Sequence, residues 1–368
     1  MIKVIIGGGG SGGHVFPAIA IANAITKIAP DAEILFIGAK GKLEMEKVPA
    51  AGYQIEGLNI SGFQRSLTIK NLSFPCKVLS SLIRANQIIK QFKPDVVIGV
   101  GGYASGPALR IAAWKKIPTL IQEQNSYPGI TNKLLGKKAT KVCVAYEGMK
   151  RFFPEEKITL TGNPVRRDIV LNPNKREEAI SFFGLRKDKK TVLVLGGSLG
   201  AGTINASVSQ CLEQNITDKG LQFIWQTGKY YYDEINSKKD IISNPDVRLY
   251  SFIERMDLAY NAADLVISRA GAIAISELCI IGKPAILIPS PNVAEDHQTK
   301  NAQALLNQNA AILLPDSQAK EKLFQTLLSL AEDKDMQIRL MENIRTMAIP
   351  DAAERIAEEA LKMIKQKC

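Results

Sequence analysis

The chain has 368 residues, 46% of them hydrophobic and 6% aromatic, a length that exceeds one typical domain and predicts two. Its five cysteines are scattered and form no Cys-x-x-Cys pair, which indicates a reducing cytoplasm and argues against a structural zinc site. The first residues have too short an apolar run for a signal peptide, and no run of about 18 uncharged apolar residues occurs, so we expect a chain that does not span a membrane.

The excess positive charge lies entirely in the first half of the chain. The net charge is +11, and residues 1–163 hold 21 Lys and Arg against 10 Asp and Glu, whereas residues 164–368 hold 26 of each. Such asymmetry indicates a partner with fixed negative charge. Because aromatic residues are sparse and no nucleic-acid-binding module is recognisable, a membrane surface or an anionic substrate is favoured over nucleic acid.

The first half alternates apolar strands with helices. A glycine loop at 7–13 follows the first strand, and two polar clusters, 101–106 and 122–125, follow later strands. Alternation of this kind is typical of a doubly wound parallel sheet, which presents functional groups at the carboxyl ends of its strands. For each polar cluster alone, a turn rich in capping residues is an equally open interpretation. We expect strands at 2–6, 33–37, 53–58, 95–100, 118–121 and 141–144, and helices at 16–28, 43–48 and 72–92.

The second half repeats this plan after a polar stretch with two prolines, 162–178, which we interpret as a hinge. Strands are expected at 191–195, 221–226, 247–251, 264–268 and 285–288, with a second glycine loop after the first of them. The sequence therefore predicts an α/β protein with two doubly wound, Rossmann-like domains facing a cleft. We place the domains at residues 1–163 and 164–350, followed by a terminal helix in 351–368 for which the first domain is one candidate packing partner.

The first glycine loop formally satisfies the dinucleotide-binding pattern G-x-G-x-x-G. That pattern needs an acidic residue at the end of the next strand, and here the strand ends in Gly38 and Ala39, so a nicotinamide-dependent enzyme is only a minor alternative. The loop instead lets phosphates or a sugar approach the backbone. His14, directly after the loop, is a candidate general base or phosphate contact, with a structural role equally open. For the other histidine, His297, we favour a loop-ordering role.

Residues 263–302 predict a nucleotide-diphosphate site. An apolar strand, a turn with Arg269 and an apolar helix carrying Glu277 follow one another. Free N–H groups near Ala272 and Ile273, the helix dipole and the arginine favour negative charge, while the glutamate suits two ribose hydroxyls. Each residue alone has an ordinary structural interpretation, but their combination in one βαβ unit favours the nucleotide site. The Asp-x-Asp run at 333–335 is interpreted as solvated surface, and no metal site is expected.

A membrane-contact segment is expected in the basic first half. It consists of an apolar stripe with basic neighbours, which suits the surface of an anionic bilayer, although an ordinary core-facing amphipathic helix fits the periodicity equally well. The charge asymmetry favours membrane contact. The residues are Leu72, Phe74, Val78, Leu79, Leu82 and Ile83 with Lys70, Lys77 and Arg84, and further on Trp114, Lys115 and Lys116.

The motifs together resemble one enzyme family over essentially the whole chain. They are similar to the bacterial N-acetylglucosaminyl transferases of peptidoglycan synthesis, the MurG family, which convert lipid I to lipid II. The motifs, in the order of that family, are GGGSGGHVFPAIAIA, GVGGYASGPA, QEQNSYPGITNK, GNPVR, GGSLGA, SRAGAIAISEL and AEDHQTKNA.

The resemblance implies a GT-B glycosyltransferase that needs no metal or other cofactor. Its donor would be UDP-N-acetylglucosamine, and its acceptor the C4 hydroxyl of undecaprenyl-linked lipid I, with inversion at the anomeric carbon. The protein would be peripheral on an anionic membrane, at the cytoplasmic face of the inner membrane, with other cell-wall synthesis proteins as further partners and no nucleic acid.

The resemblance also implies a set of site residues. His14 would activate the acceptor or contact a diphosphate. Donor contacts would come from Ser11, Gly12, Gly13, Asn125, Arg166, Ser198, Ile253, Ala272, Ile273, Ala274, Ile275, Ser276, Glu277 and Gln298.

This sequence departs from the family pattern at three of these motifs. The second glycine loop has Leu199 where glutamine is usual, and the QEQN motif has Gln122 where histidine is frequent, so backbone roles are expected there rather than side-chain roles. Ser11 replaces a common threonine and keeps the hydroxyl. The alternatives are a related GT-B enzyme with another acceptor, such as a diacylglycerol glycosyltransferase or a sugar-nucleotide epimerase, and a non-catalytic nucleotide-sugar-binding subunit.

Overall fold

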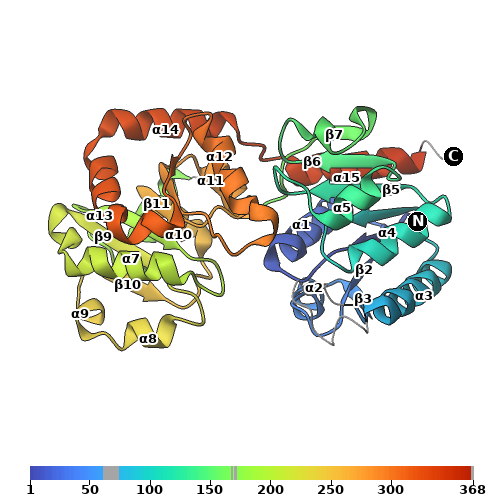
Figure 1. Ribbon diagram of the computed structural model, residues 1–368, viewed down its shortest axis with the longest axis horizontal. Helices are drawn as coiled ribbons and strands as arrows, with labels where there is room; N and C mark the ends of the chain where they lie inside the picture. Colours follow the sequence, from blue (N-terminus) through green and yellow to red (C-terminus); the bar gives the residue numbers. More distant parts are fainter. Residues whose placement is uncertain (61–73, 167–168, 170–171, 366–368) are drawn as a thin grey trace. The chain divides into compact units, whose positions relative to one another are not determined.

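The computed structural model describes residues 1–60, 74–166, 169 and 172–365, which form two compact units (Figure 1). The first unit comprises Met1–Arg166 together with Ile349–Cys368, and the second comprises Arg167–Ala348. The expected boundaries at 163/164 and 350/351 lie close to these. Each unit is described by itself below.

The first unit is built on a seven-stranded sheet with the order β3-β2-β1-β4-β5-β6-β7. Every strand pair described in it is parallel, which confirms the doubly wound prediction. The edge strand β7 was not predicted, because it is short and only half-buried and so has no apolar run. The strands are β1 (Lys3–Gly7), β2 (Glu33–Ala39), β3 (Gln54–Leu58), β4 (Val96–Gly99), β5 (Thr119–Glu123), β6 (Lys141–Val144) and β7 (Ile158–Leu160).

The first helix starts earlier than expected. We predicted a start at Phe16 or Pro17, but Ser11 is the N-cap and the proline lies inside the helix. The prediction was wrong because two glycines form the first turn, where no side-chain pattern marks a helix. Two further helices, α4 and α5, lie between strands where the general alternation applies but no individual helix was predicted. The helices are α1 (Gly12–Ile28), α2 (Glu44–Ala50), α3 (Phe74–Phe92), α4 (Ser105–Trp114) and α5 (Ile130–Gly136).

The last helix, α15 (Ala352–Lys365), belongs to the first unit although it ends the chain. It packs against α1, and Figure 1 shows it, in red, among the blue and green elements of this unit. Its apolar face, with Ile356 fully buried, joins one core cluster with Ile21 and Ile25 of α1 and Val4 and Ile6 of β1. The first hydrophobic core is therefore completed by residues from both ends of the sequence.

The second unit contains a six-stranded sheet with the order β10-β9-β8-β11-β12-β13, and its described strand pairs are again parallel. The two-residue strand β13 was too short to predict. The strands are β8 (Lys190–Leu195), β9 (Leu221–Gln226), β10 (Val247–Tyr250), β11 (Leu265–Ser268), β12 (Ala285–Leu287) and β13 (Ile312–Leu313). The helices are α6 (Arg176–Phe182), α7 (Gly202–Glu213), α8 (Tyr232–Asn236), α9 (Lys239–Ile242), α10 (Met256–Ala262), α11 (Ala272–Ile281), α12 (His297–Leu306), α13 (Asp316–Glu332) and α14 (Lys334–Thr346). The expected hinge at 162–178 includes the first residues of α6, so part of it is helical.

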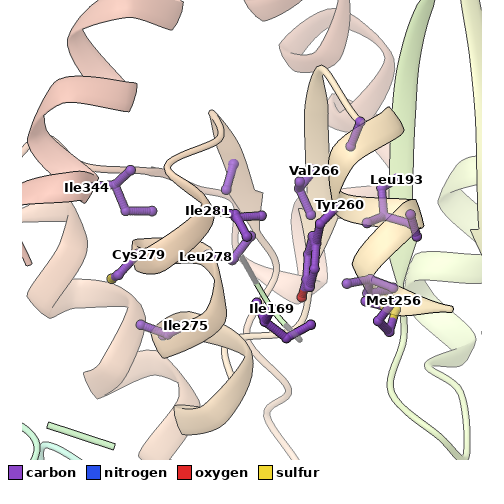
Figure 2. Packing of buried hydrophobic residues seen from close by; sticks show 14 of the residues in the cluster. Ile169, Leu193, Met256, Tyr260, Val266, Ile275, Leu278, Cys279, Ile281 and Ile344 are labelled. Atoms are coloured by element: carbon purple, nitrogen blue, oxygen red, sulfur yellow. The ribbon is translucent and has the colours of Figure 1, made fainter. Parts of the chain in front are cut away.

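The core of the second unit lies on both faces of its sheet. Along β8, Val192 and Val194 enter one hydrophobic cluster whereas Leu193 and Leu195 enter the other, as the period of two in a strand requires. Figure 2 shows one of these clusters, where side chains of β8, α10, β11, α11 and α14 pack together. Because both faces are covered, the central strands are continuous apolar runs, which is why they were predictable.

We expect Ile356→Ala in α15 to destabilise the protein by about 2 to 5 kcal/mol, because it removes a fully buried side chain and leaves a cavity in the first core. Urea denaturation followed by circular dichroism measures this change. The matched control is Ile338→Ala in α14, whose side chain is 53% exposed and whose loss should change the free energy of unfolding by less than about 0.5 kcal/mol. Equal effects of the two substitutions would contradict the packing of α15.

Candidate functional site

The first glycine loop wraps around a buried carboxylate. Glu44 of α2 is 1% exposed, and its two oxygens accept hydrogen bonds from the backbone N–H groups of Gly10 and Ala39, both at 2.9 Å. A Cβ on Gly9, where φ is +151°, would lie 2.1 Å from the same carboxylate, so only glycine fits. The Gly10 N–H therefore serves the fold. The sequence did not reveal Glu44, because a glutamate in the first turn of a helix ordinarily faces water.

The glycine-rich segment 101–106, which follows β4, contacts the backbone of this loop. A Cβ on Gly102, where φ is +80°, would lie 2.2 Å from the carbonyl oxygen of Gly9. A Cβ on Gly101 would lie 2.7 Å from Cδ2 and 2.9 Å from Nε2 of His14. The adjacent parallel strands β1 and β4 bring these loops together, and the missing side chains leave room for the imidazole.

The position of His14 determines which ring nitrogen carries the proton. Its Nδ1 lies 3.2 Å from the carbonyl oxygen of Gly9 and 3.2 Å from Oγ of Ser11. A carbonyl oxygen only accepts hydrogen bonds, so we assign the proton of the neutral ring to Nδ1. This tautomer makes Nε2 the proton-accepting nitrogen. Ser11, the N-cap of α1, thus lies against the histidine.

The QEQN motif at the end of β5 is organised by a second buried carboxylate. Glu123 is 1% exposed and accepts hydrogen bonds from the backbone and side-chain nitrogens of Asn125 at 3.0 and 3.2 Å. It also accepts from Gly129 N at 3.1 Å and from Asn132 Nδ2 at 2.8 Å. Burial raises the pKa of Glu123, and these hydrogen bonds oppose the rise. The half-buried side chain of Asn125 is therefore held in one orientation by its neighbour.

The flanking glutamines of this motif are structural. Gln122 is fully buried and donates from Nε2 to Oδ1 of Asn163 at 3.0 Å, and Gln124 donates to the carbonyl oxygen of Val100 at 2.7 Å. Gln122 stands where the family often has histidine, and its side chain contributes to this interior network. Arg166 is half-buried at the end of the first unit, and its donor contact stays a prediction.

The second glycine loop, between β8 and α7, is tied down by Gln226, which is 5% exposed. The Gln226 side chain donates to the carbonyl oxygen of Gly197 at 3.2 Å and accepts from the backbone N–H of Ile253 at 2.8 Å. Ile253 is only 2% exposed, and its contact with the donor stays a prediction. Ser198 is exposed, and Leu199 is 56% exposed. In the sequence, Gln226 stands out only as a polar residue at the end of an apolar strand.

The turn between β11 and α11 forms a helix N-terminus. Gly271 is the N-cap, and α11 begins at Ala272, so the first N–H groups of the helix are not used by helical hydrogen bonds. Ile275 is 2% exposed and belongs to the core, and its contact with the donor stays a prediction. The other expected residues here, Ala272, Ile273, Ala274, Ser276 and Glu277, are half-buried.

Arg269 in this turn has a different partner from the one expected. Its Nη1 donates to the carbonyl oxygen of Ile288 at 2.9 Å and forms an ion pair with Asp316 at the start of α13. Both charged side chains are largely buried, and Thr203 of α7 donates to the same carboxylate at 2.9 Å. The charge of Arg269 is thus compensated within the fold, which corrects the interpretation that it holds a bound anion.

Two polar segments of the second unit are explained by local hydrogen bonds. Oε1 of Gln298, in the first turn of α12, accepts from the backbone N–H of Ser290 at 2.9 Å and so orders the loop after β12. His297 begins that helix. In the expected surface run, Asp333 is the N-cap of α14 and accepts from Met336 N at 2.8 Å. Among the described residues, no group of three His, Cys, Asp or Glu side chains is arranged to hold a metal ion.

Several large apolar side chains of the first unit are exposed on three helices that contact in series, α3 with α4 and α4 with α5. They are Leu79 (61%), Ile83 (53%), Trp114 (57%), Ile130 (63%) and Leu134 (70%), and we call them the α3–α5 apolar surface. The opposite face of α3, with Ala85, Ile88 and Ile89, is buried in the core. The helix therefore has both the core-facing side and the exposed apolar side that the sequence left open. The expected residues 70 and 72 and the side chain of Phe74 lie outside the described part.

The described residues include no helix with the length and apolarity that crossing a bilayer requires.

Comparisons with known proteins define the class of protein. Residues 4–144 match the glycosyltransferase family 28 N-terminal domain, and residues 191–356 match the glycosyltransferase family 28 C-terminal domain. Among solved structures, an Acinetobacter baumannii MurG has a TM-score of 0.79 and 28% identity, with coverage of 98% of this chain and 100% of that chain. A UDP-GlcNAc 2-epimerase from Neisseria meningitidis, at 15% identity and a TM-score of 0.70, shares the fold over 98% of this chain and 99% of its own. These matches define a glycosyltransferase with the GT-B fold.

Curated relatives make the assignment more specific. Proteins from Parabacteroides distasonis and Flavobacterium psychrophilum are 54% and 53% identical over 365 residues each. These alignments cover 99% of this chain in both cases and 99% and 98% of the relatives. Both are named UDP-N-acetylglucosamine–N-acetylmuramyl-(pentapeptide) pyrophosphoryl-undecaprenol N-acetylglucosamine transferase. The chain belongs to this family of glycosyltransferases.

We expect Glu44→Gln to destabilise the first unit by about 1 to 3 kcal/mol, because one of two buried N–H groups would then face an amide NH₂. Urea denaturation measures the change. The matched control is Glu46→Gln on the same helix, whose side chain is 73% exposed. If both substitutions changed the free energy of unfolding equally, Glu44 would not be what holds the loop.

Proposed function

We propose that this protein transfers N-acetylglucosamine from UDP-N-acetylglucosamine to the C4 hydroxyl of lipid I, which forms lipid II with inversion at the anomeric carbon. The observation that carries the proposal is the near-full-length identity of 54% to a relative named for this transfer. The site geometry supports it, because each unit has a ligand-accepting arrangement at the carboxyl edge of a parallel sheet.

The second unit is assigned to the donor. The N–H groups at the start of α11 meet the diphosphate, and the carboxylate of Glu277, just over one turn further along, accepts hydrogen bonds from the ribose hydroxyls. The backbone at Ile253 lies beside the uracil. Ser198 of the second glycine loop and Gln298 supply further polar contacts. Ala272, Ile273, Ala274, Ile275 and Ser276 contribute as part of the helix start, and Ile275 also packs in the core.

The first unit is assigned to the acceptor and to proton transfer. Nε2 of His14 takes the proton of the acceptor hydroxyl as its oxygen attacks the anomeric carbon, and UDP leaves from the opposite face. The neutral Nδ1–H tautomer, assigned from the contact with the Gly9 carbonyl oxygen, is the one that this role needs. Ser11, Gly12 and Gly13 present the start of α1 to the substrate, and Asn125 is oriented for it by Glu123. Apart from His14, these residues bind and orient.

The leaving diphosphate is stabilised by protein groups alone in this proposal. The helix N-terminus of α11 and Arg166 are assigned this role, while Arg269 is engaged with Asp316. Loss of one donor of this kind typically costs about 2.7 to 4 kcal/mol of barrier. The proposal therefore includes no metal ion and no other cofactor.

We further propose that the protein binds peripherally to an anionic membrane, at the cytoplasmic face of the inner membrane, through the α3–α5 apolar surface. Basic side chains accompany it on the same helices, including Lys77 and Arg84 of α3, and Arg110, whose guanidinium lies 5.0 Å from the ring of Trp114. Apolar burial combined with attraction to anionic lipids is the usual basis of peripheral binding. Other cell-wall synthesis proteins are further proposed partners, and nucleic acid is not.

The test is UDP release from UDP-N-acetylglucosamine in EDTA, with and without a soluble lipid I analogue. Release that needs the analogue and is insensitive to EDTA is the expected result. In the same assay His14→Ala should lower kcat by about 10²- to 10⁴-fold with little change in donor affinity, because it removes the base. Glu277→Ala should mainly weaken UDP binding.

Three outcomes of this assay would contradict the proposal. Donor binding without release would favour another acceptor or a non-catalytic binding subunit. Activity lost in EDTA and restored by magnesium would contradict the metal-free mechanism. Normal turnover of the His14 variant would remove that residue as the base.

For the membrane proposal, we expect a Leu79→Glu, Ile83→Glu double variant to bind phosphatidylglycerol vesicles at least about tenfold more weakly in a co-sedimentation assay, because two apolar side chains no longer enter the interface. Ile338→Glu in α14, which replaces a similarly exposed side chain outside this surface, is the control. Unchanged binding of the double variant would place membrane contact elsewhere.

A further inference from the structure

A buried tyrosine hydroxyl contacts the glutamate of the donor site. Tyr260 of α10 is 1% exposed, and its hydroxyl donates to Oε2 of Glu277 at 2.9 Å. The ring is part of a core cluster with Leu193, Val266 and Leu278, and Figure 2 shows it within that cluster. No pattern in the sequence singled out Tyr260, because an aromatic residue in an apolar helix is ordinarily interpreted as core.

The surroundings of Tyr260 keep its hydroxyl in one place. All seven residues of α10 are buried, and the helix starts at a tight ionic cluster in which Asp257 accepts from Arg255 at 2.9 Å and from Lys175 at 3.2 Å. The guanidinium of Arg255 holds the pKa of Asp257 well below its usual range. A packed aromatic ring has two side-chain torsions, and both are restricted here.

The glutamate is less restricted by its own helix. Glu277 is half-buried, and its carboxylate lies at the end of three rotatable bonds. A hydrogen bond from a fixed phenol selects one orientation of the carboxylate, whose oxygens accept from it. A carboxylate has about four lone-pair positions, and this bond occupies one of them.

We propose that Tyr260 is a positioning residue for Glu277, and that this pair sets the preference of the donor site for a ribonucleoside over a deoxyribonucleoside diphosphate. The inference rests on the proposed function, in which Glu277 accepts hydrogen bonds from the ribose hydroxyls. A pre-oriented carboxylate meets a vicinal diol without the entropic cost of ordering the side chain on binding. Loss of the phenol hydroxyl therefore affects the ligand that has both hydroxyls more than the ligand that lacks one.

The test measures Kd for UDP and for 2′-deoxy-UDP by isothermal titration calorimetry with the full chain. We expect the unsubstituted protein to prefer UDP by about tenfold or more, the value of a hydrogen bond to a charged group. Tyr260→Phe should weaken UDP binding by about three- to tenfold and 2′-deoxy-UDP binding by less than about twofold, so that the preference shrinks. In a Glu277→Gln background, Tyr260→Phe should add no further loss of the preference.

The matched control is Tyr250→Phe in β10. Tyr250 also packs against this core, with its ring edge-on to Phe183 at 5.7 Å, and burial raises its pKa. This variant removes a hydroxyl from the same core without touching Glu277, so it should keep the full preference for UDP.

Each other outcome has a definite meaning. Equal weakening of both ligands by Tyr260→Phe, or no change in either, would reduce Tyr260 to a core residue and overturn the inference. If the unsubstituted protein binds UDP without preferring it over 2′-deoxy-UDP, the inference fails while the donor assignment survives. If it binds neither ligand, the proposed function itself fails.

Discussion

The parallel direction of the strands is the constraint on which the rest of this structure depends. In the described part of both sheets every strand pairs in parallel, so the strands of each sheet end at one edge and every connection must return across a face. That geometry gathers the loops after β1, β4 and β5 in the first unit. It likewise gathers the loops after β8, β9 and β11 in the second. The strand direction alone therefore places loops that are far apart in sequence at the same edge of a sheet.

The loops at these sheet edges are held in one conformation by buried polar side chains. Glu44 holds the first glycine loop, Glu123 orients Asn125, and Gln226 ties the second glycine loop to the backbone of Ile253. In each case a buried side chain accepts hydrogen bonds from N–H groups of the loop and so fixes its conformation. The loops are thus ordered before any substrate arrives, which is what favours tight binding of a substrate and of its transition state.

The sequence predicted what is periodic and local. The central strands β8, β9 and β11 are predominantly apolar and buried, and the glycine loops and the α11 start follow from short patterns. The start of α1 was missed because glycines form its first turn. The partners of Arg269 and of Tyr260 were missed because each contact joins residues 47 and 17 positions apart, a relation that a single sequence does not encode. For α3 the periodicity left a membrane-facing and a core-facing helix open, because it does not say which apolar side chains are covered; Leu79 and Ile83 are exposed and Ile88 is buried.

The place of α15 has a consequence for how the protein is made. The first unit needs residues from both ends of the sequence, whereas the second is one continuous segment. A ribosome releases the N-terminal sheet early, yet the helix that covers α1 emerges only after the whole second unit. Until then, the apolar side chains that α15 covers remain exposed to solvent and accessible to chaperones. The second unit can finish folding during synthesis, and the unit translated first is the last to be complete.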